Sequence, residues 1–314
     1  MFLVCGEALW DLFPSSGRAG MAFDAQIGGS PFNVAVGLAR LGQPSALFTE
    51  LSTDRLGGAL RAALEAEGVA TRFLVRSDRL SILSLIDLAA DGSATYTFYG
   101  IDHGRSAKAD LALPALDAGV WGVHVGSFAL VVEPTGTALL ELAAREAGRR
   151  LITFDPNVRL NVVPDRDLWR ARVEAAVRSS DVVKASSEDL GLLYPGATGA
   201  DIAARWRAAG AGLVIVTRGP DGAEAFSATG RVELPGRRVD VTDTTGAGDS
   251  FQAALIAGLA ERRITGRRQL DALDADTITA MVGFAIDAAA ITCSRRGADL
   301  PRRDVVAVAA AKNR

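Results

Sequence analysis

Short apolar runs alternate along the chain with longer segments in which apolar residues recur every three or four positions. The short runs are typical of buried β-strands, and the longer spacing is typical of amphipathic helices. Strands are expected at residues 2–5, 46–48, 73–75, 82–88, 94–98, 123–125, 151–154, 182–184 and 213–217. Helices are expected at residues 30–41, 56–67, 135–147, 168–177, 202–209, 246–260 and 277–292. The alternation predicts an α/β fold with a mostly parallel sheet and helices on both faces.

Two segments depart from this alternation. Between residues 73 and 102, three strand patterns follow one another without an intervening helix, and Asp91-Gly92 between the last two is a strong hairpin signal. This segment is therefore expected to form an inserted sheet or lid. Residues 221–241 form a second hairpin-like piece, and residues 6–27 are interpreted as a polar, glycine-rich connection.

The helix expected at residues 30–41 carries signals at both ends. Ser30 is expected to be its N-cap, and Pro31 to occupy the first helical position, where a missing N–H is tolerated. Gly42 is expected to end the helix, because glycine readily adopts the left-handed conformation that often follows a helix. The glycine pair Gly28 and Gly29 therefore lies directly before a helix N-terminus.

The chain has 314 residues, of which 49% are hydrophobic and 23% charged. This length suits one large α/β domain with an accessory element, and the composition is ordinary for a protein with a sizeable core. The net charge of −3, without a run of lysine and arginine, argues against a nucleic-acid partner. We expect no apolar stretch approaching the roughly 20 residues of a membrane span, and no signal peptide. A cytoplasmic protein without a membrane partner is therefore expected.

Cysteine and histidine are too sparse for a disulfide framework or a zinc site. Cys5 and Cys293 are the two cysteines, and Cys5 lies in an apolar strand pattern, so a buried structural thiol is expected. His103 and His124 are the two histidines. We expect each to be a surface or strand-end polar residue rather than a catalyst.

The strongest chemical signal is the string DTTGAGDSF at residues 243–251, between an expected strand and an expected helix. Its two glycines let the backbone approach a ligand closely, and the helix N-terminus adds partial positive charge, so the turn is suited to bind an anion. Asp249 is a carboxylate at this anion site. It either caps the helix, as aspartate often does, or accepts a proton from an attacking hydroxyl while the turn holds a phosphoryl group. The strand–turn–helix context favours the second interpretation.

Two other nucleotide-binding signatures are absent. The chain contains no Walker-type string GxxxxGK followed by serine or threonine, and no GxGxxG string after the first strand. These absences argue against a P-loop enzyme and against a dinucleotide-binding protein.

The chain resembles the ribokinase-like, or PfkB, carbohydrate kinases. The string at residues 243–251 is similar to the C-terminal signature of that family, and GGSPFNVA at residues 28–35 is similar to its N-terminal signature. Fructokinase-like members are the most similar. The strings that suggest this are GEALWD at residues 6–11, EPT at residues 133–135 and DPNVR at residues 155–159. The resemblance implies a three-layer α/β/α ribokinase-like fold with a small inserted β-sheet lid, built from segments at about residues 10–26 and 73–102.

The resemblance also implies a sugar site. Asp11 and Asn33 would bind sugar hydroxyls, and Gly28 and Gly29 would let the sugar approach the backbone. Arg159 would contact either the sugar or the phosphates. Structural explanations remain for all five: a surface turn for the aspartate, a tight turn for the glycines, a satisfied polar residue in the first helical turn for the asparagine, and a solvated side chain for the arginine.

At the reacting centre, the resemblance implies that Asp249 is the catalytic base. The backbone amides of Gly246, Ala247 and Gly248 would form the anion hole for the transferring phosphoryl group. These residues all lie in the string described above.

On the nucleotide side, the string TRGPDG at residues 217–222 is similar to the family's Thr-x-Gly-x-x-Gly element, which lies near the ATP phosphates. Thr217, Gly219 and Gly222 are therefore expected to bind ATP. Taken alone, this string is only a turn.

The string KASSED at residues 184–189 stands where the family has an Asn-x-x-Glu motif that supports Mg²⁺ and phosphate. It departs from that motif, with Ser186 and Asp189 at the two key positions. Lys184 is expected to bind ATP, and either Asp189 or Glu188 to support Mg²⁺ through water, because Mg²⁺ usually keeps several waters.

The family often uses a monovalent cation beside the anion hole. Asp243 and Thr245 match one half of that site, and the loop at residues 292–297 lies where the other half should be. Pro301 departs from the family, because it replaces a residue that often contributes. Activation by K⁺ is expected from the match at Asp243 and Thr245.

Together, these features imply an enzyme that transfers the γ-phosphate of ATP to a hydroxyl of a small sugar, with ATP and Mg²⁺ as cofactors and fructose as the first candidate. A 2-keto-3-deoxygluconate kinase is the alternative, because it shares the fold and many motifs. A non-catalytic sugar or nucleotide sensor on the same fold is a different class, and Asp249 argues against it. Lids of this family often pair between subunits, so a homodimer through the lid is expected.

Overall fold

The computed structural model describes residues 1–15, 21–88, 94–101 and 111–312. Within these residues, a nine-stranded sheet forms the middle layer of the molecule, in the order β13-β12-β11-β10-β9-β8-β1-β4-β5. The strands are β1 (Phe2–Cys5), β4 (Ser45–Ser52), β5 (Leu74–Ser77), β8 (Gly122–Gly126), β9 (Leu151–Asp155), β10 (Val182–Ser186), β11 (Leu213–Thr217), β12 (Ala223–Ser227) and β13 (Gly230–Leu234). β12 runs antiparallel to both β11 and β13, and all other neighbours pair in parallel. β12 and β13 form the hairpin expected at residues 221–241.

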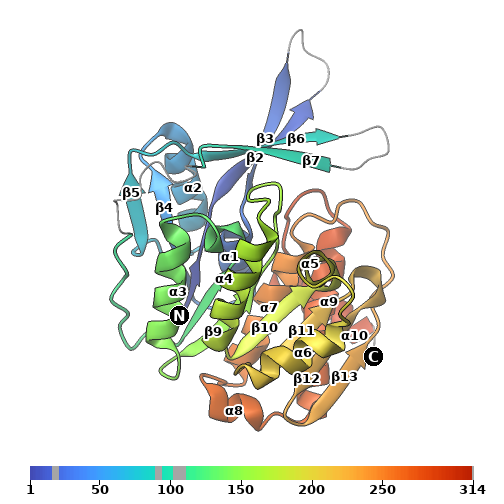
Figure 1. Cartoon of the computed structure of the whole chain (residues 1–314). Helices are drawn as coiled ribbons and strands as arrows, with labels where there is room; N and C mark the ends of the chain where they lie inside the picture. Colours follow the sequence, from blue (N-terminus) through green and yellow to red (C-terminus); the bar gives the residue numbers. More distant parts are fainter. Residues whose placement is uncertain (16–20, 89–93, 102–110, 313–314) are drawn as a thin grey trace.

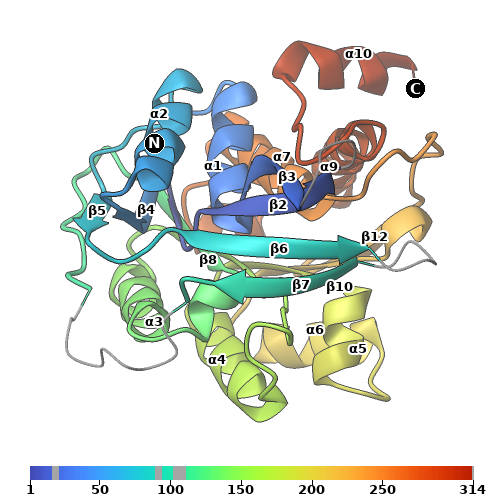
Figure 2. The same ribbon diagram turned by 90° about the horizontal axis from the view of Figure 1, so that it is seen from above.

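Helices cover both faces of this sheet (Figures 1 and 2). Side chains of a strand point alternately to its two faces, so Phe2 and Val4 of β1 join one core while Leu3 and Cys5 join the other. The first core is closed by α1 (Ser30–Arg40), α2 (Arg55–Ala66), α7 (Ala247–Glu261), α8 (Arg267–Asp271), α9 (Ala275–Cys293) and α10 (Arg303–Lys312). The second is closed by α3 (Thr135–Glu146), α4 (Arg166–Arg178), α5 (Ser187–Leu193) and α6 (Gly199–Ala208). The three-layer α/β/α fold is confirmed.

A separate four-stranded sheet, which we call the small sheet, stands over one edge of this body (Figure 1). Its order is β3 (Ala22–Gly28), β2 (Leu9–Ser15), β6 (Ile82–Leu88) and β7 (Ala94–Tyr99). β2 begins four residues after the end of β1, so the small sheet grows out of the carboxyl end of a central strand.

Two details of the small sheet differ from the expectation. The connection expected at residues 6–27 contains β2 and β3, whose apolar and polar positions alternate too weakly to be recognised. The strand expected at residues 73–75 is β5, which pairs with β4 at the edge of the large sheet, so the second segment of the small sheet begins at Ile82. The hairpin signal Asp91-Gly92 lies outside the described residues.

Local signals explain how the helices near the site begin. α1 starts at Ser30, but its N-cap is Gly29 with a φ of 101°, so the expectation of Ser30 as the cap is off by one residue. Gly42 follows α1 with a φ of 80°, as expected for a helix stop. α5 was not expected, because its seven residues are too few to show a helical period; a capping box of Ser186 and Asp189 opens it.

Among the described residues, α9 is 19 residues long with a mean hydropathy of 1.4, which is long and apolar enough to cross a membrane by length and composition alone. The expectation that no apolar stretch approaches that length is therefore wrong. α9 packs against α7 and β13, with Ile278 and Met281 in the core, so in this fold it is a core helix.

Candidate active site

The turn at residues 243–248 leads into α7 and is shaped by glycine. Gly246 precedes the helix with a φ of 78°, in the left-handed region, and a Cβ there would lie 2.7 Å from the Cβ of Ala298. The amide of Ala247 donates to the carbonyl of Thr244 at 3.2 Å, so this amide, expected in the anion hole, is already used within the turn. In the described part of the chain, the amide of Gly248 has no backbone acceptor, and it lies at a helix N-terminus.

Asp249 lies in the first turn of α7 and is 8% exposed. Its Oδ1 accepts from the hydroxyl of Ser30 at 2.6 Å, and its Oδ2 accepts from Nδ2 of Asn33 at 2.8 Å. Both donors come from the first turn of α1, so two helix N-termini meet at this carboxylate. Its oxygens are therefore held by α1 and not used to cap α7, which argues against the capping interpretation.

Asp11 lies on β2, at the face of the small sheet that approaches this centre. A Cβ at Gly28 would lie 2.1 Å from Oδ2 of Asp11, and a Cβ at Gly29 would lie 2.8 Å from the carbonyl oxygen of Glu7, so both glycines are needed for close packing. Burial raises the pKa of Asp11 to about 6, with a further contribution from Asp249, against the opposing effects of Ser84 and Arg159. The carboxylates of Asp11 and Asp249 therefore belong to one electrostatic site.

Lys184, on β10, forms an ion pair with Asp155 at the end of the neighbouring strand β9. Nζ of Lys184 donates to Oδ2 of Asp155 at 2.7 Å, and the two side chains are 5% and 3% exposed. Burial disfavours the ammonium, but the partner carboxylate outweighs it and raises the pKa of Lys184. A Cβ at Gly248 would lie 3.2 Å from Nζ, so this charge lies directly against the turn at residues 243–248. Oδ1 of Asp155 is buried without a hydrogen-bond partner among the described residues.

The residues expected to bind ATP beyond Lys184 form a tight turn after β11. Thr217 is the last residue of the strand and pairs with Ser186 of β10, so the turn lies beside the start of α5. Gly219 and Gly222 have φ values of 54° and 93°, and a Cβ at Gly222 would lie 2.0 Å from the carbonyl oxygen of Leu234. The glycines are thus required by the turn itself.

The two candidate metal carboxylates at the start of α5 differ in environment. Asp189 is 6% exposed, and its oxygens accept from the backbone amides of Val158 at 2.9 Å and Ser186 at 3.4 Å. Glu188 is exposed. Asp189 therefore fixes the start of α5 to the segment that carries Arg159, which is itself exposed, while Glu188 is open to solvent.

Asp243 lies against the segment that follows α9, and Thr245 is joined to Asp243. Oδ1 of Asp243 accepts from the amide of Thr245 and Oδ2 accepts from the amide of Gly297, both at 2.9 Å. Burial tends to raise the pKa of Asp243, but these hydrogen bonds outweigh it and hold the pKa below its usual value. The carboxylate is therefore charged and joins the turn to the chain after α9.

His124 lies in the middle of β8 and is 1% exposed, so the expectation of a surface or strand-end residue is wrong; His103 lies outside the described residues. Its Nδ1 is 2.9 Å from Oγ1 of Thr153 and 3.4 Å from Nε2 of Gln252. Burial, with the nearby charge of Lys184, lowers the pKa of His124 to about 3. The ring is therefore neutral near pH 7 and is a poor proton acceptor.

Two polar groups of the site were not found from the sequence. Ser30, expected as a cap, donates to Asp249. Glu7 appeared only in a motif string, yet it is 5% exposed and accepts from the amide of Ala129 at 3.3 Å. Its position was the available signal, because polar residues just after a parallel strand lie where α/β sheets bind ligands.

Glu7→Gln is expected to change how stability depends on pH. Burial raises the pKa of Glu7 to about 7 from its ordinary 4.5, so the folded protein keeps a proton that the unfolded chain loses between these values. The free energy of unfolding contributed by Glu7 therefore falls as pH rises through this window. The free energy of unfolding of the variant, measured in urea relative to that of the parent protein, should rise by up to about 3 kcal/mol between pH 4.5 and pH 8. An equal pH profile for both proteins would contradict this; Glu141→Gln, on the exposed side of α3, is the control.

Comparison with known proteins identifies relatives over nearly the whole chain. The model of the pfkB family of carbohydrate kinases matches residues 2–304. A fructokinase of Rhizobium leguminosarum bv. trifolii is 36% identical over 277 residues, which cover 87% of this chain and 84% of the relative.

Solved structures agree. Fructokinase from Xylella fastidiosa with bound ATP superposes with a TM-score of 0.88 at 27% identity, covering 99% of this chain and 98% of that one. Fructokinase from Vibrio cholerae O395, with fructose, ADP and a calcium ion bound, gives a TM-score of 0.83 at 27% identity, covering 98% and 97% of the two chains. A double mutant of the same Vibrio enzyme was solved with fructose, ADP and a potassium ion.

Proposed function

The chain belongs to the pfkB family of carbohydrate kinases, and from this premise we propose that it transfers the γ-phosphate of ATP to fructose with Asp249 as the base. The observation that carries the proposal is the pair of hydrogen bonds that Ser30 and Asn33 donate to Asp249. They fix this buried carboxylate in the first turn of α7, one residue after Gly248. Fructose is favoured because the relatives described above are fructokinases. Nothing in those relatives supports the alternative sugar acid, 2-keto-3-deoxygluconate.

In this proposal, the sugar binds between the small sheet and the large one. Asp11 accepts hydrogen bonds from sugar hydroxyls, and the bare backbone at Gly28 and Gly29 lets the ring lie close to the start of α1. Arg159 is exposed at the edge of this space and contacts the sugar or the phosphates. The small sheet acts as a lid that keeps water, the competing acceptor, away from the reacting phosphate.

Proton transfer follows from the geometry of Asp249. Ser30 and Asn33 each donate to one of its two oxygens, so each oxygen keeps a further lone pair that can accept the hydroxyl proton of the bound sugar. The carboxylate takes the hydroxyl proton as the oxygen attacks the γ-phosphorus, and the bond to the ADP oxygen breaks. Loss of a positioned base costs about 10²–10⁴-fold in rate.

Charge on the transferring group is balanced by groups of the turn and its neighbour. The amides of Gly246 and Gly248 lie at the N-terminus of α7, and Lys184 lies against the same turn with its ammonium fixed by Asp155. Such fixed donors need no reorganisation as charge develops, which is why they lower the barrier. On the other side, Thr217, Gly219 and Gly222 hold the ATP phosphates.

The donor set also fits metal ions of the family. Mg²⁺ needs only one or two protein carboxylates beside phosphates and water, and the exposed Glu188 and the orphaned Oδ1 of Asp155 supply oxygens of this kind. When bound, Mg²⁺ would neutralise phosphate charge. Asp243 and Thr245 are the candidates for K⁺, since they carry a charged carboxylate beside the anion hole.

Free thiols at Cys5 and Cys293 suit the reducing cytoplasm to which we assign the enzyme.

A substrate panel tests the proposal. ADP release by the purified protein should give a kcat/KM for fructose at least about tenfold above those for 2-keto-3-deoxygluconate, ribose and adenosine, because a pocket that hydrogen-bonds hydroxyls rejects a wrong pattern. Parallel assays with and without K⁺ measure its activation. Sugar binding by calorimetry without ADP release would instead support a sensor.

We also propose a homodimer through the small sheet. The strand register places Leu12, Leu83 and Leu85 on the face opposite Asp11, and all three are partly exposed. A second copy of the chain would cover this apolar face. Light scattering should give twice the mass of 32.7 kDa, and Leu85→Asp should give the single mass. A monomeric parent protein would contradict the proposal, and Val308→Asp on the exposed side of α10 is the control.

A further inference from the structure

A loop at residues 293–300, which we call the backing loop, lies behind the catalytic turn. The carbonyl of Cys293 accepts from the amide of Asp243 at 3.2 Å, and the amide of Gly297 donates to the carboxylate of Asp243 at 2.9 Å. A Cβ at Gly246 would lie 2.7 Å from a side chain of this loop. The backing loop therefore restrains the position of the turn through these hydrogen bonds and this close packing.

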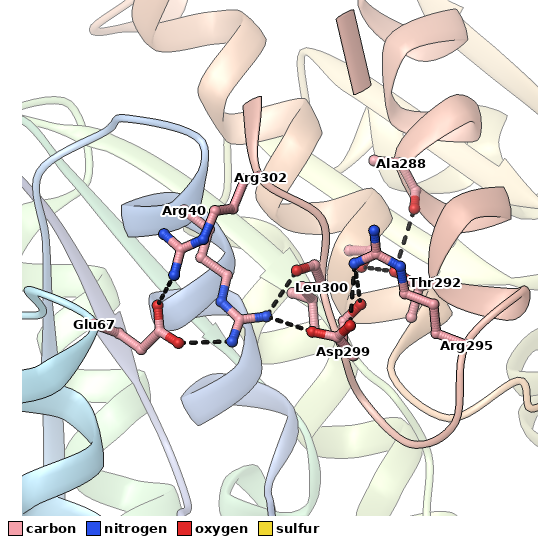
Figure 3. Close-up of polar contacts among 9 residues, drawn as sticks. Arg40, Glu67, Ala288, Thr292, Arg295, Asp299, Leu300 and Arg302 are labelled. Carbon is pink, nitrogen blue, oxygen red and sulfur yellow. Dashed lines mark hydrogen bonds and ion pairs between the residues drawn. The ribbon is translucent and has the colours of Figure 1, made fainter. Parts of the chain in front are cut away.

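Arg40, the last residue of α1, holds the far end of the backing loop (Figure 3). Its Nη1 donates to the carbonyl of Leu300 at 2.7 Å and to Oδ1 of Asp299 at 2.9 Å. Its Nη2 donates to Oε1 of Glu67 at 2.6 Å, and these bonds hold the pKa of Glu67 below its usual value. The side chain is 20% exposed. One planar guanidinium thus joins α1, the end of α2 and the backing loop.

The same helix holds the catalytic carboxylate at its other end. Ser30 and Asn33, in the first turn of α1, donate to Asp249. Along the helix, a Cβ at Gly37 would lie 2.5 Å from Cδ2 of Leu300, so the backing loop also packs directly on α1. α1 therefore contacts the base at its N-terminal end and the support of the anion-binding turn at its C-terminal end.

We propose that Arg40 is a positioning residue for phosphoryl transfer, which fixes the Gly246–Gly248 turn and the adjoining Asp249 relative to α1 through the backing loop. The inference rests on the proposed function, because it requires Asp249 to act on the attacking hydroxyl while the turn holds the phosphoryl group that this hydroxyl attacks. A geometric error of about 1 Å between such groups costs on the order of 100-fold in rate. In the proposed function, the parts of the substrates away from the reacting groups are bound by residues of the small sheet and of the turn after β11, which Arg40 does not contact.

Arg302 offers a matched control. It is the same residue type and donates to the same Glu67, at 3.3 Å, but this bond does not involve the backing loop. Its side chain is 64% exposed. If only the loss of a positively charged partner of Glu67 mattered, the Arg40 and Arg302 variants would lose kcat equally. If positioning of the turn matters, only the Arg40 variant loses kcat.

The test compares kcat per folded molecule with ligand affinity. For Arg40→Met, ADP release with fructose should show kcat lowered about 10- to 100-fold, while calorimetric affinities for fructose and for ATP change less than about twofold. Arg40→Lys should recover part of kcat, since an ammonium can reach some of the three partners but lacks the planar fork. Arg302→Met should keep the parent kcat. Urea unfolding gives the folded fraction used for correction.

Other outcomes decide against the inference. Parent-like kcat in folded Arg40→Met, or an equal fall in Arg302→Met, would overturn it. Should Arg40→Met fail to fold, Arg40→Lys and Asp299→Asn decide, and parent-like kcat in both would overturn it. A parent protein that releases no ADP with any sugar would remove the proposed function and this inference with it, whereas an active parent with unaffected variants would remove this inference alone.

Discussion

Asp249→Asn is expected to lower kcat for fructose phosphorylation by about 10²–10⁴-fold while leaving the affinity for ATP unchanged. The amide keeps the volume of the side chain but cannot take the proton of the attacking hydroxyl. It can still accept from Asn33, and the hydroxyl of Ser30 can turn to accept from the new amide, so the contact with α1 survives. ADP release under saturating substrates gives kcat, and calorimetry gives the ATP dissociation constant.

Asp276→Asn is the matched control for this variant. Asp276 also lies in the first turn of a long apolar helix, α9, but it is exposed. The control should keep the parent kcat, since the macrodipole interaction that it loses is a surface effect of about 0.3–1 kcal/mol on stability. Near-normal turnover of Asp249→Asn would remove Asp249 from the role of base. An equal loss of ATP binding would indicate that the turn had collapsed.

The order of elements could be predicted from the sequence because several strands of the large sheet, such as β4, β8 and β9, are short apolar runs followed by a helical period. β8, β9, β10 and β11 are buried on both faces, which makes such runs nearly continuous in sequence. β2 and β3 could not be found in the same way. Leu9–Ser15 contains aspartate and proline, and only its first residue is fully buried, so neither alternation nor composition indicates a strand.

At the site, local patterns identified single residues and missed the pairs that they form. The string containing Gly246 and Asp249 indicated an anion site because its chemistry is local. The bond from Ser30 to Asp249 spans 219 positions, and the ion pair of Lys184 with Asp155 depends on two strands lying side by side. Sequence spacing does not encode such contacts, since they follow from the strand order of the folded sheet.

The ion pair of Lys184 with Asp155 separates structural from catalytic roles in a second experiment. Lys184→Met should lower the free energy of unfolding by about 3–5 kcal/mol, because it leaves a buried carboxylate without its partner. Lys184→Met/Asp155→Leu should recover most of that loss, because an apolar pair of similar volume often replaces a buried ion pair at little cost. The double variant should nevertheless show kcat lowered by at least about 10²–10³-fold, because it removes one fixed donor to a transition-state charge and also the Asp155 oxygen proposed for Mg²⁺.

Another ion pair with a buried carboxylate, Arg237 with Asp287, provides the comparison for this result. Its Nε–Oδ1 distance is 2.6 Å, and Asp287 is 4% exposed on α9. Arg237→Met should therefore also destabilise the protein but keep the parent kcat per folded molecule. If the Lys184→Met/Asp155→Leu variant regained both stability and turnover, Lys184 would be a structural residue like Arg237, and the charge on the phosphoryl group would have to be met by the Gly246 and Gly248 amides and bound cations alone.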